Sequence, residues 1–420
     1  MTSENNTQYA AFAGLDWADQ EHVVELIGND GRRQKFKLQQ TPEAIEEWAR
    51  KVAHQFRGER IAVCLEQSRG AVVAALLQYE IFVLFPVNPK QLARFREAMY
   101  PSGSKDDPTD AELLAELVRH HAQHLRPWLP DDALTRQIDR CCQGRRRLVE
   151  DRKRLLQRLR QLLKEYYPLA LNLFGDRLNS SMVFDFLMRW PTLNKAQRAN
   201  PDYLRKFFRT HNCRSGKKIE GRISALRAAR PLTTDQAITE PAVLMVQALV
   251  RQLRQLNKSI ATFDEQIAKL FAQHEDREIF TSLPGAGDAL APRLLAALGG
   301  QRGRYATADE IQSYSGIAPV TKQSGRSKVV HRRYACPKFM RQTFHEFAEK
   351  SVLYSDWARA YYHLLRERGK KHNAAVRALA FKWIRIIYRM WQSHQKYDES
   401  KYLQTLAARN SPLAKTLTTT

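Results

Sequence analysis

Ile61-Ala-Val-Cys-Leu-Glu66 is an apolar run of strand length that ends on a carboxylate. Its apolar residues are consecutive, which predicts a strand buried on both faces. Three other apolar runs precede it, and turn-forming residues such as Asn29-Asp30-Gly31 separate them. These runs predict an antiparallel meander of strands over Tyr9 to Trp17, Glu21 to Gly28 and Gln34 to Leu38.

A helical crossover is predicted between this meander and the run at Ile61. Thr41-Pro-Glu43 supplies a capping residue and a first-turn proline, and apolar residues then recur on one helical face. A helix from Gly70 to Tyr79 and a strand from Ile81 to Val87 follow. Because crossovers between parallel strands are right-handed, the fourth strand is expected beside the first. This order predicts a ribonuclease-H-like α/β sheet.

Two carboxylates are expected at one edge of this sheet. Asp16 and Glu66 would lie near the carboxyl ends of adjacent parallel strands, where open sheets place their ligands. Neighbouring carboxylates repel each other unless a divalent cation lies between them, so their convergence would imply Mg²⁺ or Mn²⁺. Each residue taken singly is as well explained as a loop carboxylate or a turn former.

Lys105-Asp-Asp-Pro-Thr-Asp110 supplies further acidic residues at the start of a predicted helix. Asp107 and Asp110 are three residues apart, so both face one side of that helix and could complete a metal site. Asp106 is the less favoured alternative ligand. Helix capping by Asp107 before Pro108, with Asp110 completing the cap, explains the same residues without a metal.

The composition indicates a polyanionic partner. The chain has 420 residues, 43% of them apolar, and 68 Lys and Arg against 44 Asp and Glu give a formal charge of +24. A positive field of this size favours nucleic acid over an anionic membrane surface. Neither a membrane-spanning run nor a signal-like N-terminus is evident, and five cysteines without a C-x-x-C pair fit reduced cytosol. A soluble cytoplasmic protein, in a bacterial-type cytosol or nucleoid, is expected.

Two long helices are predicted in the middle of the chain. Apolar residues recur from Leu148 to Tyr166, and a second series runs in steps of three and four from Val246 to Leu270. These helices could pair with each other as an antiparallel hairpin, or one could pair with a second subunit. Residues 168–241 between them mix aromatic and basic side chains. This insert is either an extra RNA or DNA contact surface or a helical domain with a solvated basic face.

The C-terminal third has the form of a helix-hairpin-helix. Leu283-Pro-Gly-Ala-Gly287 leads into a helix, so the backbone at Gly285 and Gly287 could hold a DNA phosphate without reading sequence. A plain connection between two helices is the alternative.

Ser324-Gly325 lies in a segment too rich in turn formers for a regular helix. A hydroxyl beside a glycine and among cations is a place where a phosphodiester could be held and attacked. The alternative is a solvated basic loop. The cations expected to contact phosphate in and after this segment are Lys322, Arg326, Lys328, Arg332 and Arg333.

Six motifs occur in one order along the chain: Gly14-Leu-Asp-Trp-Ala18, Leu65-Glu66, Lys105-Asp-Asp-Pro-Thr-Asp-Ala111, Leu283-Pro-Gly-Ala-Gly287, Tyr314-Ser-Gly-Ile-Ala-Pro319 and Ser324-Gly325. The chain in this respect resembles the DEDD transposases of the insertion-sequence one-ten family, which are relatives of the Piv invertase. The resemblance covers about residues 10–130 and 245–395. It departs from the family at Ser315, a competing serine expected at a helix end, and in the insert, which has no assigned role.

The resemblance implies an N-terminal RuvC-like domain that holds Mg²⁺ with four acidic residues, which match Asp16, Glu66, Asp107 and Asp110. It implies a C-terminal domain whose nucleophilic serine matches Ser324. It also implies a noncoding bridge RNA that guides the protein to donor and target DNA. The assembly would be a homo-oligomer, a dimer or a tetramer, in which domains of different subunits share an active site.

The sequence therefore predicts an RNA-guided transposase that exchanges DNA strands through a covalent phosphoserine. The alternatives are a RuvC-like hydrolytic Holliday-junction nuclease, in which Ser324 is only a loop residue, and a non-enzymatic RNA- or DNA-binding protein. The predicted domains are a RuvC-like domain over 1–130, a basic coiled-coil region over 131–275 with the insert, a mostly helical transposase domain over 276–400 and a flexible tail over 401–420.

Overall fold

A computed structural model describes residues 8–66, 70–99, 107–325, 327–409 and 413. The chain divides into two compact units, residues 1–130 and 131–420, and each is described by itself. Within the described residues, no helix combines the length and the apolarity needed to span a membrane.

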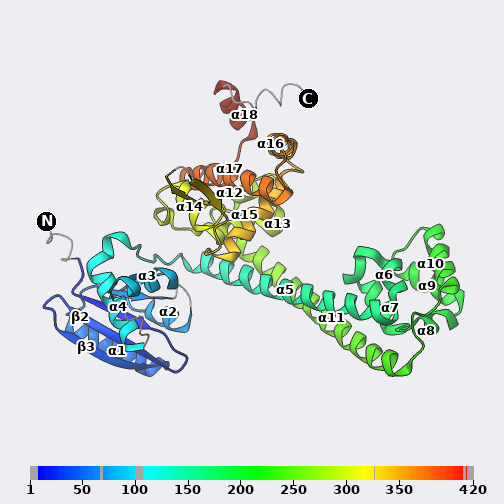
Figure 1. Cartoon of the computed structure of the whole chain (residues 1–420), viewed down its shortest axis with the longest axis horizontal. Helices are drawn as coiled ribbons and strands as arrows, with labels where there is room; N and C mark the ends of the chain where they lie inside the picture. Colours follow the sequence, from blue (N-terminus) through cyan, green and yellow to red (C-terminus); the bar gives the residue numbers. More distant parts are fainter. Residues whose placement is uncertain (1–7, 67–69, 100–106, 326, 410–412, 414–420) are drawn as a thin grey trace. The chain divides into compact units, whose positions relative to one another are not determined.

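The first unit is built on a five-stranded sheet in the order β3-β2-β1-β4-β5 (Figure 1). β1 pairs antiparallel with β2 and parallel with β4, so the fourth strand lies beside the first as predicted. The predicted meander and crossover are therefore both present. The strands are β1 (Ala11–Asp16), β2 (Glu21–Gly28), β3 (Arg33–Gln39), β4 (Ile61–Leu65) and β5 (Phe82–Pro86).

Helices cover the two faces of this sheet. Thr41 caps the first helix, because its hydroxyl accepts a hydrogen bond from the Ala44 amide at 3.3 Å, and Trp48 packs with one face of the sheet. The other face packs against the helix over residues 107–121, through Leu114 and Leu117. The helices are α1 (Pro42–Gln55), α2 (Ala71–Leu76), α3 (Pro89–Met99), α4 (Asp107–His121) and the short 3₁₀ helix η1 (Ala122–His124).

Gly14 allows α4 to lie directly on the sheet. A Cβ atom at this position would be 1.9 Å from the Ala111 carbonyl oxygen and 2.4 Å from the Ala115 amide nitrogen. No side chain fits in that space, so the backbones of β1 and α4 meet there. The start of α4 is thereby placed over the end of β1 that carries Asp16.

Glu25 on β2 is buried beside the same helix. Its side chain is 1% exposed, and neither carboxylate oxygen has a hydrogen-bond partner. Arg33 Nη1 and Lys35 Nζ lie 4.0 and 3.8 Å from these oxygens, while Arg33 also bonds Glu112 at 2.6 Å. Burial raises the pKa of Glu25, and the attraction of Lys35 offsets this only in part.

Glu25→Gln is therefore expected to raise the free energy of unfolding by about 1 kcal/mol near neutral pH. A raised folded-state pKa destabilises the fold as pH rises above the ordinary glutamate pKa, because the folded chain must then bury the charge. Urea unfolding at several pH values measures the effect. The gain should disappear well below the ordinary glutamate pKa, where Glu25 binds a proton in both the folded and the unfolded state. Glu47→Gln, at an exposed site on α1, is the control and should be neutral throughout. An equal gain at both pH values would contradict this account.

Two long helices of the second unit pair with each other. α5 (Ala133–Tyr166) and α11 (Gln236–Ala272) run antiparallel, because Arg145 bonds Asp264 and Arg152 bonds Asn257. The first of the two predicted pairings, the intrachain hairpin, is the one present. The second apolar series was predicted well, with Val246, Leu253 and Ile260 all buried.

Residues 168–235 connect the two long helices and form helices of their own (Figure 1). These helices pack around an aromatic core. The second long helix starts at Gln236, so the predicted insert boundary at Pro241 lies five residues too late and inside a helix. The connecting elements are α6 (Pro168–Phe174), η2 (Gly175–Asn179), α7 (Ser181–Arg189), α8 (Leu193–Arg198), α9 (Pro201–Thr210) and α10 (Gly216–Ala228).

The chain after α11 forms a further group of helices, which pack around three buried tryptophans, Trp357, Trp383 and Trp391. The helices are α12 (Arg277–Thr281), α13 (Gly287–Leu298), η3 (Arg302–Arg304), α14 (Ala308–Tyr314), α15 (Lys338–Ser351), α16 (Asp356–Glu367), α17 (His372–Ser393) and α18 (Glu399–Ala408). A two-stranded hairpin, β6 (Val320–Ser324) and β7 (Ser327–His331), completes the fold.

The predicted flexible tail is wrong for its first part. α18 occupies residues 399–408, and Asp398 caps it by accepting a hydrogen bond from the Lys401 amide at 3.2 Å. Leu406 is buried, and the tilted rings of Tyr402 and Trp357 pack with their centroids 4.8 Å apart. These two contacts hold the helix on the core, and their partners are distant in sequence.

Candidate functional site

The acidic edge lies at the carboxyl ends of β1 and β4. Leu15 pairs with Leu65, so Asp16 and Glu66 each follow a paired strand position, and both side chains are half-buried. Side chains alternate along a strand, which puts Asp16 on the α4 face with Gly14. Cys64 also lies on the α4 face, where it shares a core with Leu114. Burial raises the pKa of the Cys64 thiol, and the negative charge of Glu66 raises it further, so Glu66 lies near Cys64.

Asp110 joins this edge from the first turn of α4. It is the residue before Ala111, whose carbonyl oxygen lies against Gly14, and it is only 4% exposed. Arg96 donates to Asp110 Oδ1 through Nε at 2.9 Å and through Nη2. A guanidinium thus neutralises a carboxylate that the sequence assigns to a metal site.

Arg96 lies on α3, a helix that the sequence analysis did not predict. Its side chain is only 15% exposed. A usable signal was present in the sequence, because Leu92, Phe95 and Arg96 recur at helical spacing after Pro89.

Arg96→Ala is expected to destabilise the first unit by about 2–4 kcal/mol, because it leaves Asp110 buried without its cationic partner. Thermal unfolding at neutral pH measures the loss. Arg94→Ala changes an exposed arginine on the same helix and should be close to neutral. Equal losses in the two variants would show that the pair contributes nothing specific.

Asp107 is the first residue of α4, and its side chain is outside the described part of the structure, as is the whole of Asp106. Within the described part, no three His, Cys, Asp or Glu side chains gather as a ready-made metal group. The residue types still suit a hard divalent cation, because Asp16, Glu66 and Asp110 all carry the carboxylate oxygens that such a cation prefers. The metal site stays a prediction.

Ser324 lies at the turn of the β6–β7 hairpin, where the sequence indicated a loop. It is the last residue of β6, it pairs with Ser327, and its side chain is exposed. Gly325 follows with φ +53°, a conformation that glycine adopts without strain and that closes the two-residue turn. The hydroxyl is therefore presented to solvent by a strand rather than by an irregular loop.

Lys322 lies two positions before Ser324, so both side chains share one face of the hairpin. Lys322 is exposed, Arg326 lies outside the described residues, and the side chain of Lys328 is likewise not described. Arg332 and Arg333 follow β7 directly, as the sequence order requires.

Three arginines gather near the base of the hairpin. Burial lowers the pKa of Arg377, and the like charges of Arg332 and Arg341 lower it further. None of the three forms an ion pair with a carboxylate of the described residues, while Arg341 Nη1 lies 3.3 Å from Cys336 Sγ. Like-charged guanidinium groups held together without counter-charges favour an anion.

Ser315, the competing serine, is unsuited to attack. It caps the end of α14, is fully buried, and donates its hydroxyl to the Gln312 carbonyl oxygen at 3.2 Å. The expectation that it lies at a helix end is confirmed.

The two glycines of the predicted helix-hairpin-helix differ in their surroundings. A Cβ at Gly285 would be 2.7 Å from the Tyr354 ring and 3.2 Å from the Lys350 carbonyl oxygen, so packing accounts for this glycine. Gly287 has φ +51° and open space around it, and it begins α13, which has no side-chain cap. Phosphate contact at either glycine stays a prediction.

Residues of both compact units match known protein families and relatives. A family model described as a transposase matches residues 13–168, and a model of the transposase IS116/IS110/IS902 family matches residues 277–363. The mini-circle putative transposase for IS117 from Streptomyces coelicolor is 30% identical over 401 residues, which are 93% of this chain and 96% of the relative. The insertion element IS900 uncharacterized 42 kDa protein from Mycobacterium paratuberculosis is 25% identical over 92% of this chain and 96% of its own length.

Proposed function

Because the chain belongs to the IS110 family of DEDD transposases, we propose that it exchanges DNA strands through a covalent link between Ser324 and a DNA phosphate. The observation that carries the proposal is the exposed Ser324 hydroxyl, presented at a strand end on the same hairpin face as Lys322. The arginines at the base of that hairpin supply positive charge for the phosphate oxygens.

The first step is attack by the Ser324 oxygen on the scissile phosphorus. A serine oxygen–phosphorus bond forms, the bond from phosphorus to one deoxyribose oxygen breaks, and the proton passes to that departing oxygen. In the second step, a deoxyribose hydroxyl of another strand attacks the phosphoserine and releases the serine. Each step exchanges one phosphoester bond for another, so rejoining needs no external energy source.

The acidic edge would contribute to the reaction by binding a divalent cation. Asp16, Glu66, Asp107 and Asp110 would hold Mg²⁺ or Mn²⁺, which polarises a phosphoryl oxygen and favours ionisation of a nearby hydroxyl when bound. Arg96 holds Asp110 in one orientation and neutralises it until a cation competes for its oxygens.

The +24 charge supports a complex with two nucleic acids, the DNA that is cut and a noncoding bridge RNA that guides the protein to it. We further propose a homo-oligomer, a dimer or a tetramer, in which the acidic edge of one subunit acts with the hairpin of another. The acidic edge and Ser324 lie in separate compact units, which leaves this arrangement open to the chain.

The test combines the protein with DNA of its element ends, the bridge RNA and Mg²⁺. A covalent protein–DNA adduct should survive denaturing electrophoresis, and mass spectrometry should map the nucleotide to the peptide that contains Ser324. Chelation of the metal with EDTA should remove both the adduct and the recombined DNA. Cut DNA without any adduct would instead establish a hydrolytic junction nuclease. Binding without cutting would establish a non-enzymatic RNA- or DNA-binding protein.

A further inference from the structure

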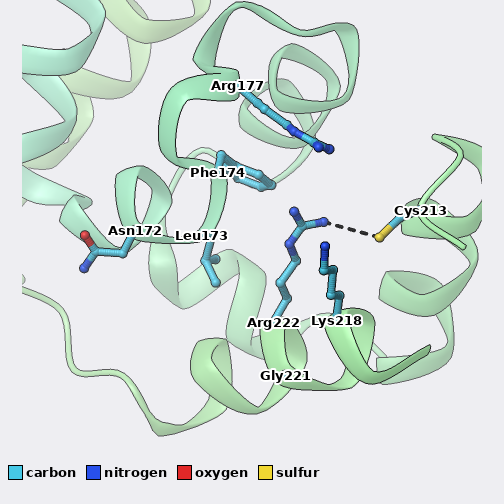
Figure 2. Close-up of a pocket in the computed structure, with 8 residues that line it drawn as sticks. All are labelled: Asn172, Leu173, Phe174, Arg177, Cys213, Lys218, Gly221 and Arg222. Atoms are coloured by element: carbon cyan, nitrogen blue, oxygen red, sulfur yellow. Dashed lines mark hydrogen bonds between the residues drawn. The ribbon is translucent and has the colours of Figure 1, made fainter. Parts of the chain in front are cut away.

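The connecting helices of the second unit contain a pocket that the proposed reaction does not use. It has a volume of about 460 Å³ and lies between the end of α6, η2, the residue Cys213 and α10. Figure 2 shows Lys218 and Arg222 extending side by side toward the middle of this pocket and Arg177 extending toward it from another segment. Asn172, also at the rim, points away from it.

Arg222 is held in place by its surroundings. Its guanidinium carbon lies 5.1 Å from the centre of the Phe208 ring and 5.6 Å from that of Phe174, and Nη1 donates to Cys213 Sγ at 3.6 Å. Both rings are buried, so they are fixed supports for the cation. A prearranged guanidinium loses little side-chain entropy when it binds an anion.

Lys218 and Arg222 are one helical turn apart on α10, so the ammonium of Lys218 and the guanidinium of Arg222 face the pocket from one side. Arg177 faces them from η2. Within the described residues, none of these three cations pairs with a carboxylate, whereas nearby Arg205 pairs with both Glu220 and Asp202. The pocket therefore presents three charges that no carboxylate in the described part of the chain pairs with.

The segment around the pocket is basic throughout. Residues 168–241 contain thirteen Lys and Arg and six Asp and Glu. Repulsion among the three converging cations makes the pocket costly unless an anion neutralises them. A phosphate group has the charge and the several acceptor oxygens that two guanidinium groups and one ammonium can bind together.

We propose that this pocket binds a phosphate of a nucleic-acid backbone, so that the connecting helices form a second nucleic-acid contact apart from the Ser324 hairpin. Arg222 is the fixed ligand, and Arg177 and Lys218 close on the phosphate from opposite sides. The contact recognises the backbone rather than the bases, because its aromatic rings are buried beneath the cations. The proposal goes beyond the strand-exchange reaction and does not depend on it.

The first experiment measures affinity by fluorescence anisotropy with the full-length protein. The probes are labelled single-stranded DNA, RNA of the same sequence and duplex DNA, and they distinguish which nucleic acid supplies the phosphate. The double variant Arg177→Glu, Lys218→Glu should weaken binding of at least one probe about tenfold or more at moderate salt. The slope of log affinity against log salt should become shallower by about 1.

The matched control is the double variant Lys195→Glu, Arg198→Glu, which makes the same charge change on α8 of the same segment at two exposed cations outside the pocket. The affinity of this control should fall much less than that of the pocket variant. Circular dichroism and thermal unfolding establish that each variant folds, and the milder Arg177→Gln, Lys218→Gln pair should show an intermediate loss. Equal losses in the control and the pocket variant, or no loss in either, would overturn the proposal.

A second readout uses Cys213, which lies in the pocket and is half-buried. Bound nucleic acid should slow its alkylation by iodoacetamide, followed by mass spectrometry, while alkylation of Cys141 on α5 should not change. The Ser324→Ala protein should show the same protection, because it keeps the pocket. If nucleic acid slows alkylation of Cys213 in the inactive Ser324→Ala protein, the pocket binds independently of the proposed reaction. If nucleic acid leaves the alkylation rate of Cys213 unchanged, the proposed site is wrong.

Discussion

Ser324→Ala is expected to lower the rate of strand exchange by at least about 1,000-fold and to remove the covalent protein–DNA adduct. The reason is chemical, since the variant keeps the hairpin but lacks the oxygen that would form the bond to phosphorus. The side chain is exposed, so its loss should leave the stability of the protein within about 0.5 kcal/mol. Gel electrophoresis under denaturing conditions and sequencing of recombined DNA give the two readouts.

The hairpin supplies its own control. Ser327 lies directly opposite Ser324 in the register and is also exposed, so Ser327→Ala removes a hydroxyl of the same type from the same turn. That variant should keep the adduct and most of the activity. Adduct formation by the Ser324→Ala protein, or its loss in the Ser327→Ala protein alone, would assign the nucleophile elsewhere.

The largest effect on stability is expected for Gly14→Ala. A methyl group would lie within 2 Å of the Ala111 carbonyl oxygen, so either β1 or α4 must move. Overpacking between two backbones costs more than overpacking among flexible side chains, and we expect a loss of more than about 3 kcal/mol. The acidic edge should be lost as well, because the same contact positions Asp110 relative to Asp16.

Hydrogen exchange measured by mass spectrometry should show this loss as faster exchange in the peptides of β1 and α4. Gly216→Ala is the control, because Gly216 has open space around it and begins a helix in the other unit. Its exchange should match that of the unaltered protein. A Gly14→Ala protein with normal exchange and normal stability would show that the helix does not rest on the strand there.

Much of the first unit was predictable from local pattern. The apolar runs at Ala11, Glu21 and Ile61 have strand periodicity, and the right-handed crossover rule alone places β4 beside β1. The two long helices were found for the same reason, since an unbroken apolar stripe such as Val246 to Leu270 has few alternatives. Such features depend on neighbours in sequence or on general rules of topology.

The features that were missed depend on contacts between distant residues. The pairing of Arg96 with Asp110 joins two helices, and nothing in either segment indicates its partner. The β6–β7 strands are short and mostly exposed, so their composition resembles a loop, and only their mutual pairing defines them. Arg222 is one of many basic residues in its segment, and nothing in the sequence sets it apart, because its support by Phe174 and Phe208 exists only in the folded chain.

Because α5 and α11 run antiparallel, the end of α5 and the start of α11 lie close together, and residues 168–235 are attached to the chain at these two ends. Leu159 and Leu163 of the outgoing helix share a core with Val246 and Leu249 of the returning one. A segment attached in this way can be replaced by a short turn, or exchanged for a different small domain, without changing the register of either long helix. The proposed phosphate pocket would then be a transferable module, one that can be added or removed without altering the pairing of the two long helices.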